Sequence, residues 1–136
     1  MASVCDVATG SFVRMTMTET PAVVAGYPLA EIVAAYVECA LWADEVYGPG
    51  DIDADSMALI EADVLTFARQ AWHVAEAAGW SAGQFGHDYF LTRNGHGAGF
   101  WCREWDADGR GDYLTRLAKA MGEWELTVCD GKVVAE

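Results

Sequence analysis

Apolar residues recur at three- and four-residue steps along two long stretches of the chain. In residues 28–47 the recurring positions are Ile32, Val33, Tyr36, Val37, Ala40 and Leu41. In residues 54–78 they are Met57, Ile60, Val64, Phe67, Ala68, Ala71, Val74 and Ala75. This spacing predicts two amphipathic helices, each with one buried face. Because a short Gly-Pro-Gly connection at 48–50 separates them, they should form an antiparallel pair.

The pattern changes in residues 86–101, which read GHDYFLTRNGHGAGFW. Residues 88–92 are typical of a strand, and Asn94-Gly95 is a strong turn dipeptide. Residues 97–101 then lead toward a second strand. The stretch therefore predicts a β-hairpin.

Two further elements are expected near the end of the chain. Asp112 can cap a third helix that runs to about Met121, with Tyr113, Leu114, Leu117, Ala118 and Met121 facing inward. Asp130-Gly131 predicts a second hairpin between residues 124–128 and 132–134. The order helix, helix, hairpin, helix, hairpin predicts an α+β fold, a small antiparallel sheet with helices packed on one face.

The chain length fits one domain. With 136 residues and 53% hydrophobic content, residues 27–136 can build a single core. Residues 1–26 have no helical apolar stripe and are expected to be an N-terminal arm, either disordered or an edge strand. Pro28, Glu31 and Glu38 interrupt the apolar run at 22–43, so we expect no membrane span and a cytoplasmic protein.

The formal net charge of −13 limits the kinds of partner. Such a field repels nucleic-acid phosphates and anionic membranes and attracts basic protein surfaces. The sequence therefore predicts a protein partner with a basic surface, with no direct nucleic-acid or membrane binding. Whether the chain is a monomer or a homodimer stays open.

The negative charge is concentrated in the N-terminal half, where residues 1–63 carry 11 acidic side chains and 1 basic. Seven acids occur without an intervening Lys or Arg: Asp44, Glu45, Asp51, Asp53, Asp55, Glu61 and Asp63. They can cap a helix and keep the protein soluble, or they can form a partner-binding acidic surface that imitates a DNA phosphate track. A calcium loop starting at Asp51 is not expected, because Ser56 and Ala62 occupy its sixth and twelfth positions.

The expected hairpin offers an alternative site. Its polar residues, with a nearby tryptophan, are His87, Asp88, Arg93, Asn94, His96 and Trp105. These types could supply a base, an orienting carboxylate and an anion contact for a small enzyme or nucleotide-binding module using residues 87–101. Their spacing favours structure instead, with Arg93 paired to a nearby acid, so no catalytic residues are assigned.

Other candidate chemistry is weak. His73, His87 and His96 lack the spacing of a metal site, and no cofactor motif occurs. The four cysteines lie far apart and are expected to be reduced thiols. The six tryptophans are expected to lie mainly in the core, although Trp105 could anchor a partner.

The hairpin stretch also carries a resemblance. Gly86-His87-Asp88, residues 91–101, and more loosely Gly122-Glu123 and residues 130–132 resemble small acidic proteins of double-stranded DNA bacteriophages and prophages, encoded in early regions. The resemblance covers roughly residues 36–133. Where that family continues with an acidic residue and an arginine, this chain has Cys102-Arg103.

The resemblance implies a phage origin and an early, host-directed role, and it supplies no catalytic residues. Together with the charge, it predicts a non-enzymatic inhibitor in the cytoplasm of the bacterial host. The inhibitor would occupy a basic, nucleic-acid-binding surface of a host enzyme or defence complex by DNA mimicry.

Overall fold

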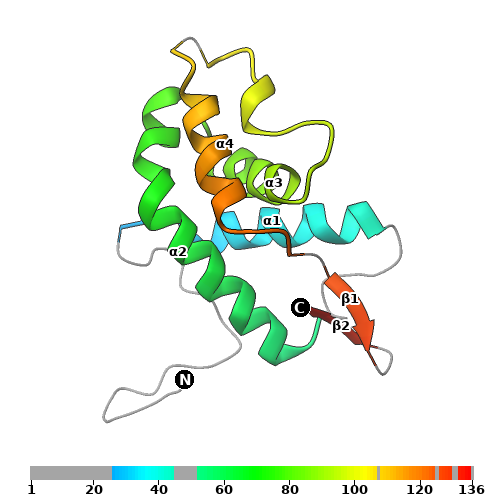
Figure 1. Cartoon of the computed structure of the whole chain (residues 1–136). Coiled ribbons are helices and arrows are strands. Elements are labelled where there is room, and N and C mark those ends of the chain that lie inside the picture. The colour runs from blue at the N-terminus through cyan, green and yellow to red at the C-terminus, as the bar shows by residue number, and fades with distance from the viewer. Residues whose placement is uncertain (1–25, 45–51, 107, 125, 130–131, 136) are drawn as a thin grey trace.

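The protein is built mainly from helices (Figure 1). The computed structural model describes residues 26–44, 52–106, 108–124, 126–129 and 132–135. Its helices are α1 (Leu29–Asp44), α2 (Ala54–Ala78), α3 (Ala82–Arg93) and α4 (Arg110–Ala120), with a 3-10 helix at Phe100–Cys102. The strands β1 (Leu126–Cys129) and β2 (Lys132–Ala135) follow α4.

The expected α+β fold is wrong. Residues 88–101 form the end of α3, a turn and the 3-10 helix, in place of the first hairpin. In the part of the chain that the structure describes, the paired strands are β1 and β2, an antiparallel ribbon with Leu126 opposite Ala135. This two-stranded ribbon lies at the site of the second expected hairpin. It is not a sheet with a layer of helices on one face, so the fold is helical.

Local signals explain why residues 82–93 are helical. The Ser81 hydroxyl accepts a hydrogen bond from the Gln84 backbone N–H at 3.1 Å, which caps the first turn. At the other end, Gly95 has a φ of +74°, and the next N–H, of His96, donates to the Leu91 carbonyl at 3.0 Å. Asn94-Gly95 therefore ends a helix instead of turning a hairpin.

The second predicted helix is confirmed at both ends. Asp53 Oδ2 accepts hydrogen bonds from the backbone N–H groups of Asp55 at 3.1 Å and Ser56 at 3.2 Å. Gly79 ends α2 in the left-handed conformation, with a φ of 110°. The first predicted helix is present as α1, and the expected extension beyond Asp44 lies outside the described residues.

The third predicted helix is present but begins earlier than expected. Asp112 lies in the first turn of α4, and the capping oxygens come from Asp106, which accepts from the N–H groups of Arg110 at 2.9 Å and Gly111 at 2.7 Å. Tyr113 was expected to face inward and is 41% exposed. Leu114 is buried as expected.

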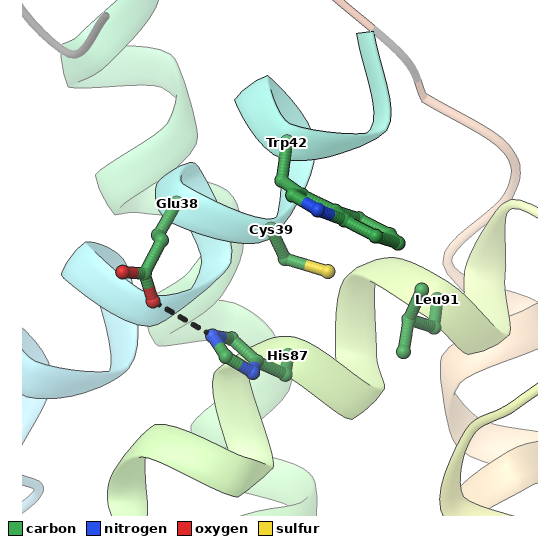
Figure 2. A pocket seen from close by; sticks show the side chains of 5 residues that line it. All are labelled: Glu38, Cys39, Trp42, His87 and Leu91. Atoms are coloured by element: carbon green, nitrogen blue, oxygen red, sulfur yellow. Dashed lines mark hydrogen bonds and ion pairs between the residues drawn. The ribbon is translucent and has the colours of Figure 1, made fainter. Parts of the chain in front are cut away.

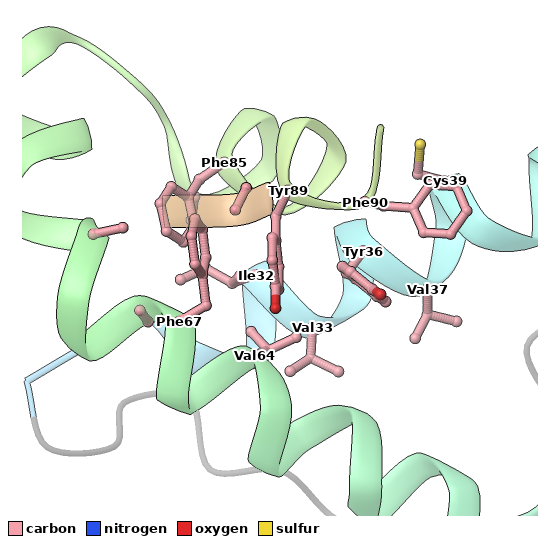
Figure 3. Packing of buried hydrophobic residues seen from close by; sticks show 14 of the residues in the cluster. Ile32, Val33, Tyr36, Val37, Cys39, Val64, Phe67, Phe85, Tyr89 and Phe90 are labelled. Carbon is pink, nitrogen blue, oxygen red and sulfur yellow. The ribbon is translucent and has the colours of Figure 1, made fainter. Parts of the chain in front are cut away.

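The core contains a group of closely packed aromatic rings contributed by several helices (Figure 3). The Phe67 ring of α2 stacks on Tyr89 of α3, with centroids 3.9 Å apart and planes 8° apart. Phe85 lies on the other side of this stack at 5.2 Å from Phe67, and Tyr36 of α1 lies 5.4 Å from Tyr89. The Tyr89 ring of α3 thereby packs against rings of both α1 and α2.

Gly86 allows α1 and α3 to approach closely. A β-carbon at this position would lie against the backbone oxygen of Ile32 and 3.0 Å from both the Ala35 β-carbon and the Tyr36 nitrogen. The absence of a side chain at Gly86 therefore determines how near the two helices lie. The surface beside this crossing holds the candidate site.

Candidate functional site

Several residues of the acidic stretch that is predicted to bind a partner are instead engaged in contacts within the fold. The side chain of Asp44 and the whole of Glu45 and Asp51 lie outside the described part of the chain. Asp53 caps α2, whereas Asp55 is exposed in its first turn. Glu61 is half-buried and interacts with other groups. The members of this stretch that the structure describes therefore differ in exposure and in their contacts.

Asp63 lies inside the molecule as the partner of Arg93. Its Oδ2 atom is 2.5 Å from Arg93 Nη1 and accepts a 2.8 Å hydrogen bond from the Tyr89 hydroxyl. The Arg93 side chain is 2% exposed, and its guanidinium lies 4.7 Å from the Tyr89 ring centroid and 5.4 Å from that of Trp124. The expectation that Arg93 pairs with an acid is confirmed.

The polar groups of this cluster have shifted acidities. Burial raises the pKa of the Tyr36 hydroxyl to about 12, against the opposing effect of the Arg93 charge. Burial also raises the pKa of Tyr89 above its ordinary value. Burial alone would lower the pKa of Arg93, but the two tyrosines and Asp63 raise it. At neutral pH the two phenols are therefore neutral and the Arg93 guanidinium is charged.

Asp88 forms a second buried ion pair. The side chain is completely buried and accepts hydrogen bonds from Trp80 Nε1 at 2.8 Å, Gln84 Nε2 at 2.9 Å and Arg103 Nε at 2.9 Å. A further bond joins Arg103 Nη2 to Asp88 Oδ1 and raises the pKa of the guanidinium. The Arg103 charge also lies 5.8 Å from the Trp105 ring centroid.

The remaining residues of the predicted hairpin site face different surroundings. The Oδ1 atom of Asn94 accepts a hydrogen bond from the backbone N–H of Trp124 at 2.8 Å. The His96 ring lies 5.5 Å from the ring of Phe90, and its Nε2 atom is buried without a hydrogen-bond partner among the described residues. The six predicted residues therefore do not converge on one catalytic centre.

His87 lines a pocket between α1 and α3. The pocket has a volume of about 380 Å³, and its lining residues are Glu38, Cys39, Trp42, His87 and Leu91. Figure 2 shows the indole of Trp42 extending over Cys39 toward Leu91, with His87 joined to Glu38 on the other side. The distance from His87 Nε2 to Glu38 Oε1 is 3.0 Å.

This pocket is suited to binding rather than to nucleophilic catalysis. Burial, with the nearby charges of Asp88 and Glu38, raises the pKa of the Cys39 thiol to about 11, so the thiolate is scarce at neutral pH. The His87 Nε2 atom contacts Glu38, and no hydrogen bond joins His87 to Cys39. A thiol without an activating base is a weak nucleophile.

Sequence reasoning missed most of this pocket. Trp42 was expected in the core, but it is 72% exposed. Because Trp42 follows Glu38 by four residues and both lie off the apolar positions of α1, helical spacing could have placed them together. Helical spacing along α1 could not have indicated that Leu91 lines the same pocket, because Leu91 belongs to residues 88–92, for which the sequence predicts a strand.

Other site classes find no support in the described ranges. No group of three or more His, Cys, Asp or Glu side chains there could hold a metal ion. Cys39 and Cys102 are free thiols, as expected. None of the helices in these ranges combines the length and the apolar character needed to cross a bilayer.

Comparisons of the chain with protein-family models, with curated proteins and with solved structures give no match.

Proposed function

We propose that this chain is an acidic, non-enzymatic binding protein that occupies a basic, nucleic-acid-binding surface of a host enzyme or defence complex. The observation that carries the proposal is the outer face of α1. Its exposed residues are Glu31, Ala34, Glu38 and Trp42, and the helix contains no Lys or Arg. A carboxylate face with an exposed indole suits a basic protein surface.

The distribution of Lys and Arg side chains also supports α1 as the face that binds the partner. In the described ranges, the charges of the buried Arg93 and the half-buried Arg103 are paired with Asp63 and Asp88, so they do little to neutralise the other carboxylates. The other described cations are on α2, α4 and β2: Arg69, Arg110, Arg116, Lys119 and Lys132. Because α1 carries acidic side chains and no cation, its charge would steer that face toward a positively charged partner.

The resemblance of residues 86–101 to early-region phage proteins supports a host-directed role in the bacterial cytoplasm. DNA mimicry is the specific form of this proposal, because a surface evolved to bind phosphates accepts carboxylates in their place. The same charge disfavours direct binding to nucleic acid.

The test is capture of partners from bacterial host lysate, followed by elution with a salt gradient and competition with duplex DNA. The test variant combines Glu31→Gln with Asp55→Asn, because both side chains are exposed. The control variant combines Glu104→Gln with Glu123→Gln, which removes two exposed charges elsewhere. Asp53 and Asp63 are left unchanged because they stabilise the fold.

We expect the captured partner to elute from the test variant at a lower salt concentration than from the control. Duplex DNA should displace it from the unchanged protein. A partner that resists both salt and DNA would contradict the proposal.

A further inference from the structure

The protein uses one arrangement twice to hold an arginine. Arg93 lies between the Asp63 carboxylate and the rings of Tyr89 and Trp124. Arg103 bonds to the Asp88 carboxylate and lies beside the ring of Trp105. In both clusters, therefore, a guanidinium has a carboxylate as hydrogen-bond acceptor and an aromatic ring as neighbour. This combination is favourable because the planar cation can bond and stack at the same time.

The pocket between α1 and α3 has the same two components without the cation. Glu38 and Trp42 lie one helical turn apart on α1, and neither Lys nor Arg is among the five lining residues. Trp42 is 72% exposed as a residue, so its side chain is available to a ligand. Cys39 and Leu91 supply apolar walls against which the methylene groups of a long side chain can lie.

His87 prepares the carboxylate for such a ligand. Its Nε2 atom contacts Oε1 of Glu38 at 3.0 Å. Within the described residues, Oε2 has no hydrogen-bond partner, so a second donor can bind there. His87 is in this sense a positioning residue for Glu38.

We infer that this pocket binds one arginine side chain of the partner protein, with the guanidinium bonded to Glu38 and stacked on Trp42. The inference rests on the proposed function, since it names the anchor through which a basic surface would be held. A cavity of about 380 Å³ has room for a single long side chain. Charge complementarity selects a cation over an apolar side chain of similar length.

The test uses small probes on the intact protein, so that it does not depend on finding a partner. n-Butylguanidinium is titrated while the indole N–H resonance of Trp42 is followed by NMR, with n-butylammonium and the neutral 1-pentanol as comparisons. We expect n-butylguanidinium to shift this resonance and to bind about tenfold more tightly than 1-pentanol. n-Butylammonium should fall between them, because it cannot stack as a plane.

Two variants and two matched controls locate the site. Glu38→Gln should weaken n-butylguanidinium binding about tenfold, and Trp42→Ala should weaken it by at least about as much, followed through the His87 ring resonances. Glu76→Gln removes an exposed acid from α2, and Leu59→Ala removes a large apolar side chain that is 54% exposed. Both controls should keep the affinity of the unchanged protein within about twofold.

The outcomes separate this inference from the proposed function. Equal affinity for 1-pentanol and n-butylguanidinium would overturn the arginine pocket, as would the lack of any shift at about 50 mM probe. A partner that elutes with salt but binds Trp42→Ala unchanged would also overturn it, while the proposed function would stand. A probe that binds as expected to a protein whose captured partner ignores salt would support the pocket chemistry and contradict the proposed function.

Discussion

Arg93 shows at the scale of one residue why a charge can be buried here. Besides Asp63, its guanidinium donates to the Gly122 carbonyl at 2.8 Å, the Met121 carbonyl at 3.2 Å and the Tyr36 hydroxyl at 3.3 Å. Four hydrogen bonds, counting the one to Asp63, therefore use four of the five N–H donors of the guanidinium, which offsets the cost of removing the cation from water. The Asp63 carboxylate is the one acceptor among these groups that also supplies a counter-charge for the buried guanidinium.

Replacing Asp63 should be much more harmful than replacing a surface acid. Asp63→Ala leaves the Arg93 charge buried without its counter-ion, which we expect to lower the free energy of unfolding by about 3–5 kcal/mol. Asp55→Ala, at an exposed position in the first turn of α2, should cost less than about 1 kcal/mol. Urea unfolding at pH 7 measures both, and similar losses would show that the ion pair is not important.

Gly86 and Gly97 should respond differently to the same added methyl group. At Gly86 the group meets the backbone of α1, so Gly86→Ala should cost more than about 2 kcal/mol or displace α3. At Gly97 no atom lies within 4 Å of the new β-carbon, so Gly97→Ala should change stability by less than about 0.5 kcal/mol.

Thermal melting of the two variants checks this contrast. A hairpin would have required small residues along its second strand, whereas the structure places Gly86 at a close helix crossing. Gly99 is also confined, because a β-carbon there would meet the Thr92 hydroxyl and the Trp101 ring. Equal melting of Gly86→Ala and the unchanged protein would contradict the close crossing.

At the scale of the element, α2 could be predicted from the sequence and α3 could not. The apolar positions of α2 recur without interruption, and both of its caps are local residues, Asp53 and Gly79. α3 contains two glycines and a β-branched threonine, which lower helix propensity. The helix is stabilised by Gly86 packing on α1 and by the buried pairs of Asp88 and Arg93, none of which a local pattern records.

One signal in the sequence did point to α3. Ser81 and Gln84 have the spacing of a capping box, and apolar residues follow at Phe85 and Tyr89. The competing Asn94-Gly95 dipeptide is compatible with either a hairpin turn or a helix end. The candidate pocket was harder to predict, because it requires α1 and α3 to lie side by side.

The helical assignment of residues 82–93 can be tested by two substitutions with opposite effects. Ser81→Ala removes the cap and should cost about 1 kcal/mol. Gly83→Ala meets no atom within 4 Å and should add about 0.5–1 kcal/mol, because alanine favours the helix. Destabilisation by Gly83→Ala in chemical denaturation would argue against a helix at this position, because alanine has the higher helix propensity.

For the whole molecule, the buried thiol and phenols predict a loss of stability at alkaline pH. The Cys39 thiol ionises near pH 9.0 in a free chain and near pH 11 in the fold. The unfolded state therefore loses its proton first, and stability present below pH 9.0 is lost as the pH rises toward 11. Tyr36 continues the same trend from 10.0 to about 12.

Denaturation midpoints measured from pH 8 to pH 11 should show this decline. Cys39→Val removes the ionisable thiol, so its stability should fall less steeply between about pH 9 and pH 11. The control is Cys102→Ser, since Cys102 is exposed. Parallel curves for Cys39→Val and the unchanged protein would show that this thiol does not govern the alkaline limit.

The hydrogen bonds from Arg93 to the end of α4 have a consequence for local unfolding of that helix. The two backbone carbonyls that it binds, of Met121 and Gly122, follow the last turn of a helix of 11 residues. Such a short helix would ordinarily fray and exchange its amide hydrogens by local opening. Here, opening that end would strip a buried cation of its acceptors, so the amides of the last turn of α4 should exchange about as slowly as those of α2. Helices α1 to α4 would then unfold as one cooperative unit, and an intermediate in which α4 alone is unfolded would not be populated.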